Sequence, residues 1–139
     1  MIVIDRPCYD NMVEHAKEGV TSEVCGVLGG RYGERDSTVT TVRRTANVAR
    51  NPTSEYHMDP EDQLEQLDSI EDEGLDVVGF YHSHPTGPPA PSRTDAARAT
   101  WPGYSYVIVA LGGEPFVGSW RWNGDADRFE AEVVRLTQS

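Results

Sequence analysis

The segment that decides the fold spans residues 75–85 and reads LDVVGFYHSHP. Apart from Asp76, its first seven residues are apolar. A short apolar run rich in β-branched and aromatic residues, with no polar alternation, is typical of a strand at the centre of a sheet. The following HSH residues continue the strand until Pro85, which cannot donate a backbone hydrogen bond and therefore ends it.

Further strands and helices are expected on both sides of this segment. The predicted strands are Met1–Ile4, Val24–Leu28, Thr38–Val48, Tyr106–Leu111 and Phe116–Trp122. One helix is expected over Arg6–Glu18 and another from Asp59 to Gly74, where Asp59 suits the N-cap and Pro60 the first helical position. The pattern over Asp127–Leu136 fits either a helix or a strand. The total is an α+β or α/β domain with helices flanking a sheet.

Length and composition indicate one cytoplasmic domain. The chain has 139 residues, 37% of them hydrophobic, which suffices for a single core over residues 1–139 without disulfide bonds. No apolar run approaches the ~20 residues of a membrane helix. The N-terminus lacks the basic and apolar regions of a signal peptide. We therefore expect a cytoplasmic protein in which Cys8 and Cys25 stay reduced.

The charge of the chain restricts its partners. The net charge is −11, and Lys17 is the only lysine among twelve basic residues. Nucleic acids and anionic membranes repel such a chain, so neither is expected as a partner. An acidic surface that keeps the protein soluble is one explanation. We favour a high-salt cytoplasm, because acid excess and lysine scarcity occur together and molar salt screens the self-repulsion.

Two histidines suggest metal chemistry. His82 and His84 lie two residues apart on a strand, so their side chains point to one face while Ser83 points to the other. Two imidazoles at a strand end form half of a zinc site, and Asp95 can supply a third ligand from a short helix expected over Ser92–Thr100. Three protein ligands leave the fourth tetrahedral position open for water, as in catalytic zinc sites.

A structural interpretation of the same residues remains open. A His-X-His pair alone is a weak motif. Ser92 and Asp95 also have the spacing of a capping box, in which the serine caps a helix and the acid three residues later bonds back to it. The residues alone therefore predict a candidate metal site, with helix capping as the alternative.

The spacing resembles the JAMM motif of the MPN+ metallopeptidase family. His82, His84, Pro85, Ser92 and Asp95 agree with that motif in identity and spacing at every position. The resemblance implies that the two histidines and the aspartate bind one catalytic Zn²⁺. It further implies that Ser92 donates a hydrogen bond to the oxyanion of the reaction.

An upstream segment extends the resemblance to a general base. Residues 21–30, TSEVCGVLGG, are similar to the family segment in which a glutamate precedes Cys-Gly and an apolar strand. The resemblance implies that Glu23 is the general base, which takes a proton from water and delivers it to the leaving amine. A surface acid beside a strand is the structural alternative.

The resemblance also implies a fold and a reaction. The MPN fold is a cytidine deaminase-like α/β structure with a central mixed β-sheet flanked by helices. The reaction is hydrolysis of the isopeptide bond between the C-terminal glycine of a ubiquitin-like protein and a lysine amine. Since the chain is compact and acidic, it is similar to the prokaryotic members, in particular to archaeal desampylases that act on small archaeal modifiers.

Three other interpretations are kept open. Some compact bacterial relatives trim an amino acid such as cysteine from a sulfur-carrier protein. MPN relatives without the metal site serve as scaffolds. A structural metal domain would need a fourth protein ligand, for example His57 or Cys25. His15 has no partner in the sequence and is expected to be an exposed helix residue.

Overall fold

Strand β4 (Asp76–His84) lies at the centre of the sheet, as its apolar sequence predicts. A computed structural model describes residues 1–138, and residues 77–84 of β4 are all buried in it. The strand pairs antiparallel with β2 (Cys25–Arg31) and parallel with β5 (Ser105–Ala110). Both neighbours are likewise buried almost throughout, which explains the absence of polar alternation in these three segments.

The other elements complete a mixed, eight-stranded sheet with the order β7-β6-β5-β4-β2-β3-β1-β8. The remaining strands are β1 (Ile2–Asp5), β3 (Ser37–Thr45), β6 (Phe116–Asn123), β7 (Arg128–Glu132) and β8 (Val134–Thr137). The helices of residues 1–138 are α1 (Arg6–Glu18), α2 (Pro60–Asp72) and α3 (Arg93–Arg98). None of them has both the length and the apolar character that a membrane crossing requires.

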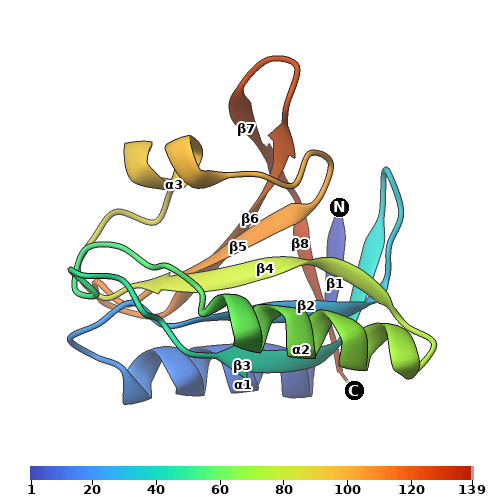
Figure 1. Cartoon of the computed structure of the whole chain (residues 1–139), viewed down its shortest axis with the longest axis horizontal. Helices are drawn as coiled ribbons and strands as arrows, with labels where there is room; N and C mark the ends of the chain where they lie inside the picture. Colours follow the sequence, from blue (N-terminus) through green and yellow to red (C-terminus); the bar gives the residue numbers. More distant parts are fainter. Residues whose placement is uncertain (139) are drawn as a thin grey trace.

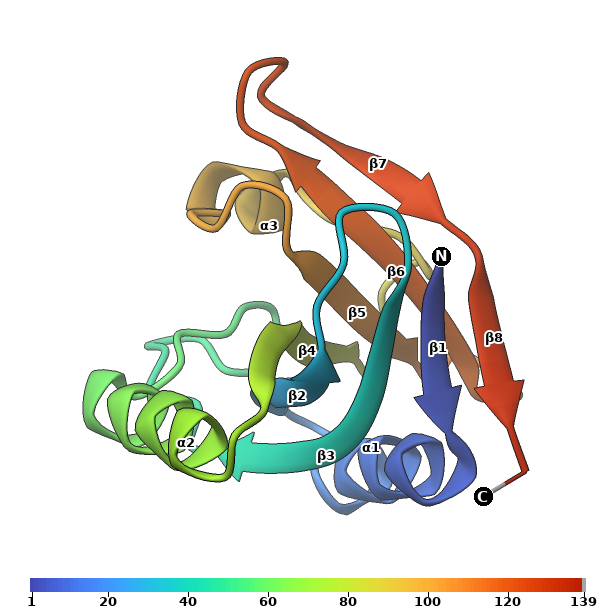
Figure 2. The same cartoon turned by 90° about the vertical axis from the view of Figure 1, so that its right-hand side faces the viewer.

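Two hydrophobic clusters lie on opposite sides of this sheet. Helix α1 contributes Cys8, Met12 and Ala16 to one cluster, where they meet apolar residues of the sheet. Helix α2 contributes Ile70 to the other, and the segment around α3 packs Ala96 there as well. Figures 1 and 2 show α1 and α2 apart on the strongly twisted sheet, with α3 beside β5 and β6.

Three local predictions are resolved by tertiary contacts. The β3 strand ends at Thr45 instead of Val48, since the chain leaves the sheet at Ala46, whose backbone N–H is bonded to the Asp62 carboxylate. The expectation of an exposed His15 without a partner is wrong: the ring is half-buried and its Nδ1 lies 2.7 Å from the Tyr81 hydroxyl. Both cysteines are free thiols, as expected.

The ambiguous segment near the C-terminus forms two strands. Strand β7 pairs with β6, and β8 pairs with β1 at the opposite end of the sheet. The chain therefore crosses from one edge strand to the other within a few residues, and the sheet is nearly closed (Figure 2). Each strand alternates polar and apolar residues, but the runs are only five and four residues long. The adjacent Val133 and Val134 break the alternation between them, so the sequence alone did not separate strand from helix.

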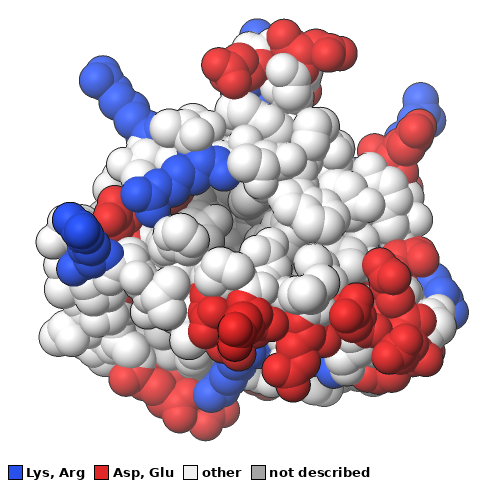
Figure 3. All heavy atoms as spheres, in the orientation of Figure 1, with Lys and Arg blue, Asp and Glu red and all other residues white. Residues whose placement is uncertain are grey.

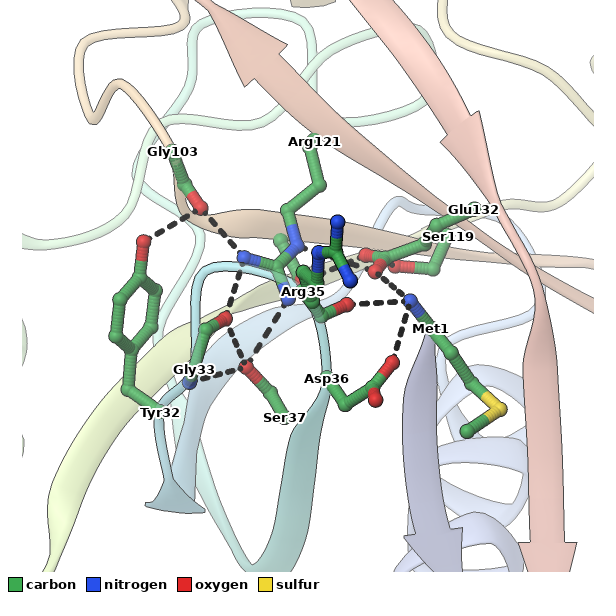
Figure 4. A network of polar contacts seen from close by, with 11 residues as sticks. Met1, Tyr32, Gly33, Arg35, Asp36, Ser37, Gly103, Ser119, Arg121 and Glu132 are labelled. Atoms are coloured by element: carbon green, nitrogen blue, oxygen red, sulfur yellow. Dashed lines mark hydrogen bonds and ion pairs between the residues drawn. The ribbon is translucent and has the colours of Figure 1, made fainter.

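A polar network centred on the ion pair between Arg121 of β6 and Glu132 of β7 reaches across the curved sheet to the N-terminus of β1 and to the β2–β3 turn (Figure 4). Arg121 Nε lies 3.1 Å from Glu132 Oε1, and the two side chains are only 15% and 6% exposed. The Arg121 guanidinium also donates to the carbonyls of Gly33 and Gly103 at 2.9 and 3.0 Å. The second Glu132 oxygen accepts from two serine hydroxyls of β5 and β6. Each charge therefore has partners that compensate for its loss of water.

Arg121→Met is expected to reduce the free energy of unfolding by up to roughly 3–5 kcal/mol, because it removes the nearer cation from the buried Glu132 carboxylate. Only the N-terminal ammonium of Met1, 3.5 Å from Glu132 Oε1, then remains beside that charge. A matched control is Arg128→Met on the same hairpin, where Arg128 and Glu130 are 66% and 50% exposed. That exposed pair should contribute less than about 1 kcal/mol. Urea unfolding of both variants measures the difference, and equal losses would contradict a special contribution of the Arg121 network.

Candidate metal centre

Strand β4 carries the two histidines at its C-terminal end. His82 lies opposite Cys25 of β2, and His84 lies opposite Ala110 of β5. Both imidazoles are buried and belong to one face, as the spacing predicts. Ser83 points to the other face, where its hydroxyl accepts a hydrogen bond from the Val24 backbone N–H at 2.9 Å. This bond fixes the segment that carries Glu23 beside the end of β4.

Three side-chain atoms converge on one point in front of β4. His82 Nε2 and His84 Nε2 are 3.2 Å apart, and each lies 3.1 Å from Asp95 Oδ2. Ligand atoms about 2.0–2.1 Å from a tetrahedral zinc ion are about 3.3 Å from one another. The triangle therefore has the dimensions that three ligands of a tetrahedral metal ion require.

The hydrogen bonds around His84 fix which nitrogen faces the centre. His84 Nδ1 lies 2.9 Å from the Pro88 carbonyl, which can only accept, so this nitrogen carries the hydrogen. In the neutral imidazole, Nε2 then presents a lone pair to Asp95 Oδ2, which is also an acceptor. Two acceptors at this distance are stabilised by a shared cation, and the backbone carbonyl orients the ring as in known metal sites.

Helix α3 supplies Asp95, and the capping box predicted for this helix is present. The Asp95 backbone N–H donates to Ser92 Oγ at 3.0 Å, and the Ser92 backbone N–H donates to Asp95 Oδ2 at 2.9 Å. The same carboxylate oxygen faces both histidines. Capping and metal binding are thus compatible, because the cap holds the carboxylate where a ligand is needed.

Glu23 is the fourth member of the group. It lies just before β2, is 6% exposed, and one of its ligand atoms lies within 4.8 Å of those of the other three residues. Its Oε1 is buried and has no hydrogen-bond partner among the described residues. Burial raises the pKa of Glu23 to about 7, although the nearby His84 lowers it. This pKa suits a group that both accepts and releases a proton near neutral pH.

Electrostatics separates the two carboxyl groups of the centre. Burial alone would raise the pKa of Asp95, but the adjacent histidine rings and the hydrogen bond from the Ser92 backbone N–H hold it well below the usual range. Asp95 is therefore an anion, while Glu23 is easily protonated. Two neighbouring carboxyl groups whose pKa values are shifted in opposite directions, one toward a permanent anion and one toward a proton carrier, are typical of active sites.

The alternative fourth ligands are not in the centre. Cys25 Sγ lies 3.4 Å from the Thr45 hydroxyl, and burial raises the pKa of this thiol to about 11. A thiol at such a pKa stays protonated and is a poor metal ligand. His57 is exposed and lies outside the group that could hold an ion. Within residues 1–138, the fourth side chain of the cluster is thus the carboxylate of Glu23.

One contact of the centre has no signal in the sequence. The Tyr56 ring stacks on His82, with centroids 4.3 Å apart and an angle of 23° between the planes. Tyr56 comes from the irregular segment between β3 and α2, which has no motif. Arg98 of α3 holds this segment by donating to the Tyr56 carbonyl at 3.1 Å and by an ion pair with Glu55 at 3.3 Å. Only tertiary contacts reveal these residues.

A cavity of about 470 Å³ lies beside the centre. Its wall includes the aromatic side chains of Tyr56, Phe80, Trp101 and Tyr106. Tyr56 separates it from His82, so the cavity and the metal centre are neighbours. Figure 3 shows this face hollowed, with Asp and Glu side chains gathered over α2 and Lys and Arg side chains over the region of α3. A cavity of this size and lining can accept a short peptide segment.

Sequence comparison decides the family. The family model for prokaryotic homologs of the JAB domain matches residues 5–123 of this chain. The chain belongs to this JAB family. The match includes Glu23, both histidines, Ser92 and Asp95, and it ends at the last residue of β6.

Relatives within the JAB family are closely similar to this chain. A desampylase from Haloferax volcanii is 45% identical over 123 residues, which cover 86% of this chain and 86% of that protein. A CysO-cysteine peptidase from Mycobacterium tuberculosis is 37% identical over 114 residues, which cover 79% of this chain and 73% of that protein. A JAB1/MPN domain protein from Archaeoglobus fulgidus has the same fold, with a TM-score of 0.64 at 18% identity over 99% of this chain and 98% of that one. The predicted MPN fold is thereby confirmed.

Proposed function

We propose that this protein is a zinc-dependent isopeptidase that cleaves the bond between the C-terminal glycine of a ubiquitin-like modifier and a lysine amine. The observation that carries the proposal is the unpartnered, buried carboxylate oxygen of Glu23 beside the converging ligand atoms of His82, His84 and Asp95. A scaffold protein has no need for a buried acid without a partner, since burial of such a group costs free energy.

His82, His84 and Asp95 would hold the zinc ion through the three atoms that already converge. A bound zinc ion would make an attacking water more acidic and polarise the carbonyl of the scissile bond. Zinc fits this donor set because two imidazoles and one carboxylate leave an open position. The proposal therefore assigns binding to these three residues and proton transfer to Glu23.

Glu23 and Ser92 would act on the reacting atoms. The Glu23 carboxylate would take a proton from the attacking water and pass it to the departing amine, so that the C–N bond breaks without release of an unstable anion. Ser92 Oγ accepts from the Asp95 backbone N–H, which leaves its own hydrogen free to point outward. That hydroxyl would donate a hydrogen bond to the oxyanion that forms at the attacked carbonyl.

The substrate assignment is supported by the desampylase from Haloferax volcanii, which this chain matches over most of its length. The extended C-terminal tail of a ubiquitin-like modifier suits a site at the open end of a sheet. We further propose that residues 1–139 form one catalytic domain that works in a high-salt cytoplasm. The charge of −11 and the single Lys17 support this environment.

A second candidate function is removal of cysteine from the C-terminus of a sulfur-carrier protein. The CysO-cysteine peptidase from Mycobacterium tuberculosis supports it. Both reactions hydrolyse an amide that follows the end of a small protein, and the same five side chains could perform either one. The leaving amine alone distinguishes them.

The deciding experiment offers two conjugates to the protein at molar salt. One carries a lysine isopeptide and the other a C-terminal cysteine. Cleavage of the isopeptide should disappear with a chelator and return with added zinc, since removal of the metal removes the polarising charge. Release of cysteine alone would select the second function. No cleavage of either conjugate, at verified zinc stoichiometry, would reject both.

A further inference from the structure

We propose that Asn47 is a positioning residue that holds Glu23 on one side of the metal centre and the Tyr56 ring on the other. This inference rests on the proposed hydrolysis and extends it to a residue outside the motif. Asn47 follows β3 in the segment that leads to α2, and its side-chain hydrogen bonds go to backbone groups and not to the converging ligand atoms.

The side-chain amide of Asn47 makes four hydrogen bonds, all to backbone groups. Its Nδ2 donates to the carbonyls of Glu23 at 2.8 Å and Glu55 at 3.1 Å. Its Oδ1 accepts from the backbone N–H of Ala49 at 3.0 Å and of His57 at 2.9 Å. The two donors and two acceptor sites of an amide are then all used. Aspartate has the same shape but lacks the two donors.

One of these bonds reaches the backbone of the general base, and a second backbone bond holds the same residue. The Glu23 carbonyl is held by Asn47, and the Glu23 backbone N–H donates to the Pro52 carbonyl at 2.6 Å. Both backbone groups of Glu23 are thus bonded to the segment between β3 and α2. Since Glu23 precedes β2, its backbone is positioned by these two bonds together with those that join the next residue, Val24, to Ser83 of β4.

The hydrogen bonds from Asn47 to Glu55 and His57 fix the aromatic contact of His82. Glu55 and His57, which Asn47 binds, are the two neighbours of Tyr56. The Tyr56 ring stacks on His82 at 4.3 Å. The Val48 N–H also donates to the His57 carbonyl at 2.8 Å, which keeps the two parts of the segment side by side. One amide therefore couples the base to the ring that packs on a metal ligand.

Asn47→Asp tests the coupling, with Asn123→Asp as matched control. Asn123 accepts two backbone N–H bonds in the β6–β7 turn, far from the centre. We expect Asn47→Asp to lower kcat by about 10- to 100-fold, as for other groups that support an active site from outside, while KM and zinc affinity change by less than about 3-fold. The control should keep its kcat. A wild-type kcat in Asn47→Asp would overturn the inference.

A second measurement does not depend on activity or on the folding of a variant. In the zinc-loaded wild type, the hydrogen bonds of the Glu23 and His57 backbone N–H groups should break in the same opening event. The hydrogen-exchange protection factors of these two groups should then agree within about 3-fold. Exchange of the Glu23 amide much faster than that of the His57 amide would show that Glu23 and the segment around Tyr56 move independently, and it would overturn the inference. If the wild type cleaves neither conjugate, the proposed function fails, while this measurement still decides whether Asn47 couples Glu23 to the segment around Tyr56.

Discussion

Glu23→Gln is expected to bind zinc as tightly as the wild type and to lose roughly 10²- to 10⁴-fold in kcat, the range that general acid–base catalysis contributes. Glutamine has nearly the shape of glutamate but cannot take up a proton. The ligand atoms of His82, His84 and Asp95 converge without Glu23, so the metal should remain. Zinc stoichiometry and single-turnover cleavage of the isopeptide conjugate measure the two effects separately.

The control for this variant is Glu65→Gln, which removes an exposed carboxylate of α2. Its kcat should equal that of the wild type, because the charge is solvated and far from the reacting atoms. Wild-type turnover in Glu23→Gln would remove Glu23 from the role of base. Loss of zinc in Glu23→Gln would instead make Glu23 a ligand.

Asp95→Ala is expected to weaken zinc binding by more than about 100-fold, because even groups that only support a ligand contribute about 10- to 100-fold. The substitution removes the anion that faces both histidines. Since the variant also loses half of the capping box, metal affinity and helix stability must be measured separately. Competition with a chromophoric chelator gives the first, and urea unfolding of the metal-free protein gives the second.

Ser92→Ala provides the matched comparison. It removes the side chain that caps α3, at a cost of about 1 kcal/mol in stability, but leaves the Asp95 carboxylate in place. Its zinc affinity should therefore stay within about 10-fold of the wild type, since the lost cap supports a ligand only indirectly. Equal zinc affinity in Asp95→Ala and the wild type would assign Asp95 to capping alone.

Local chemistry explains why much of the fold could be read in advance. The apolar run before His82 indicated a central strand, and Asp59 with Pro60 indicated the start of α2. In both cases the signal lies within a few residues of the chain, namely a continuous apolar run that suits burial on both faces or a side chain that caps its own helix. The segment after Asp127 lacks both signals, because its two short strands lie at the edges of the sheet and consist of exposed and half-buried residues.

In the candidate site too, some relations between residues follow from the local sequence and others do not. The spacing of His82 and His84 sets their common face, and the spacing of Ser92 and Asp95 sets the capping box, so these relations follow from the sequence through strand and helix periodicity. Glu23 could be selected among many acidic residues only through the family resemblance of its neighbours. Nothing in the local pattern places it near the histidines.

The sequence by itself determined the central strand, the capped helices, the histidine pair and the membership in a metallopeptidase family, because each depends on neighbours along the chain. The tertiary structure alone decided that Glu23 is buried with a free oxygen, that Tyr56 covers His82, and that Asn47 connects the two. These contacts join residues from irregular segments distant in sequence. Such segments have no periodicity, and their positions are set by hydrogen bonds and packing that exist only after the sheet has formed.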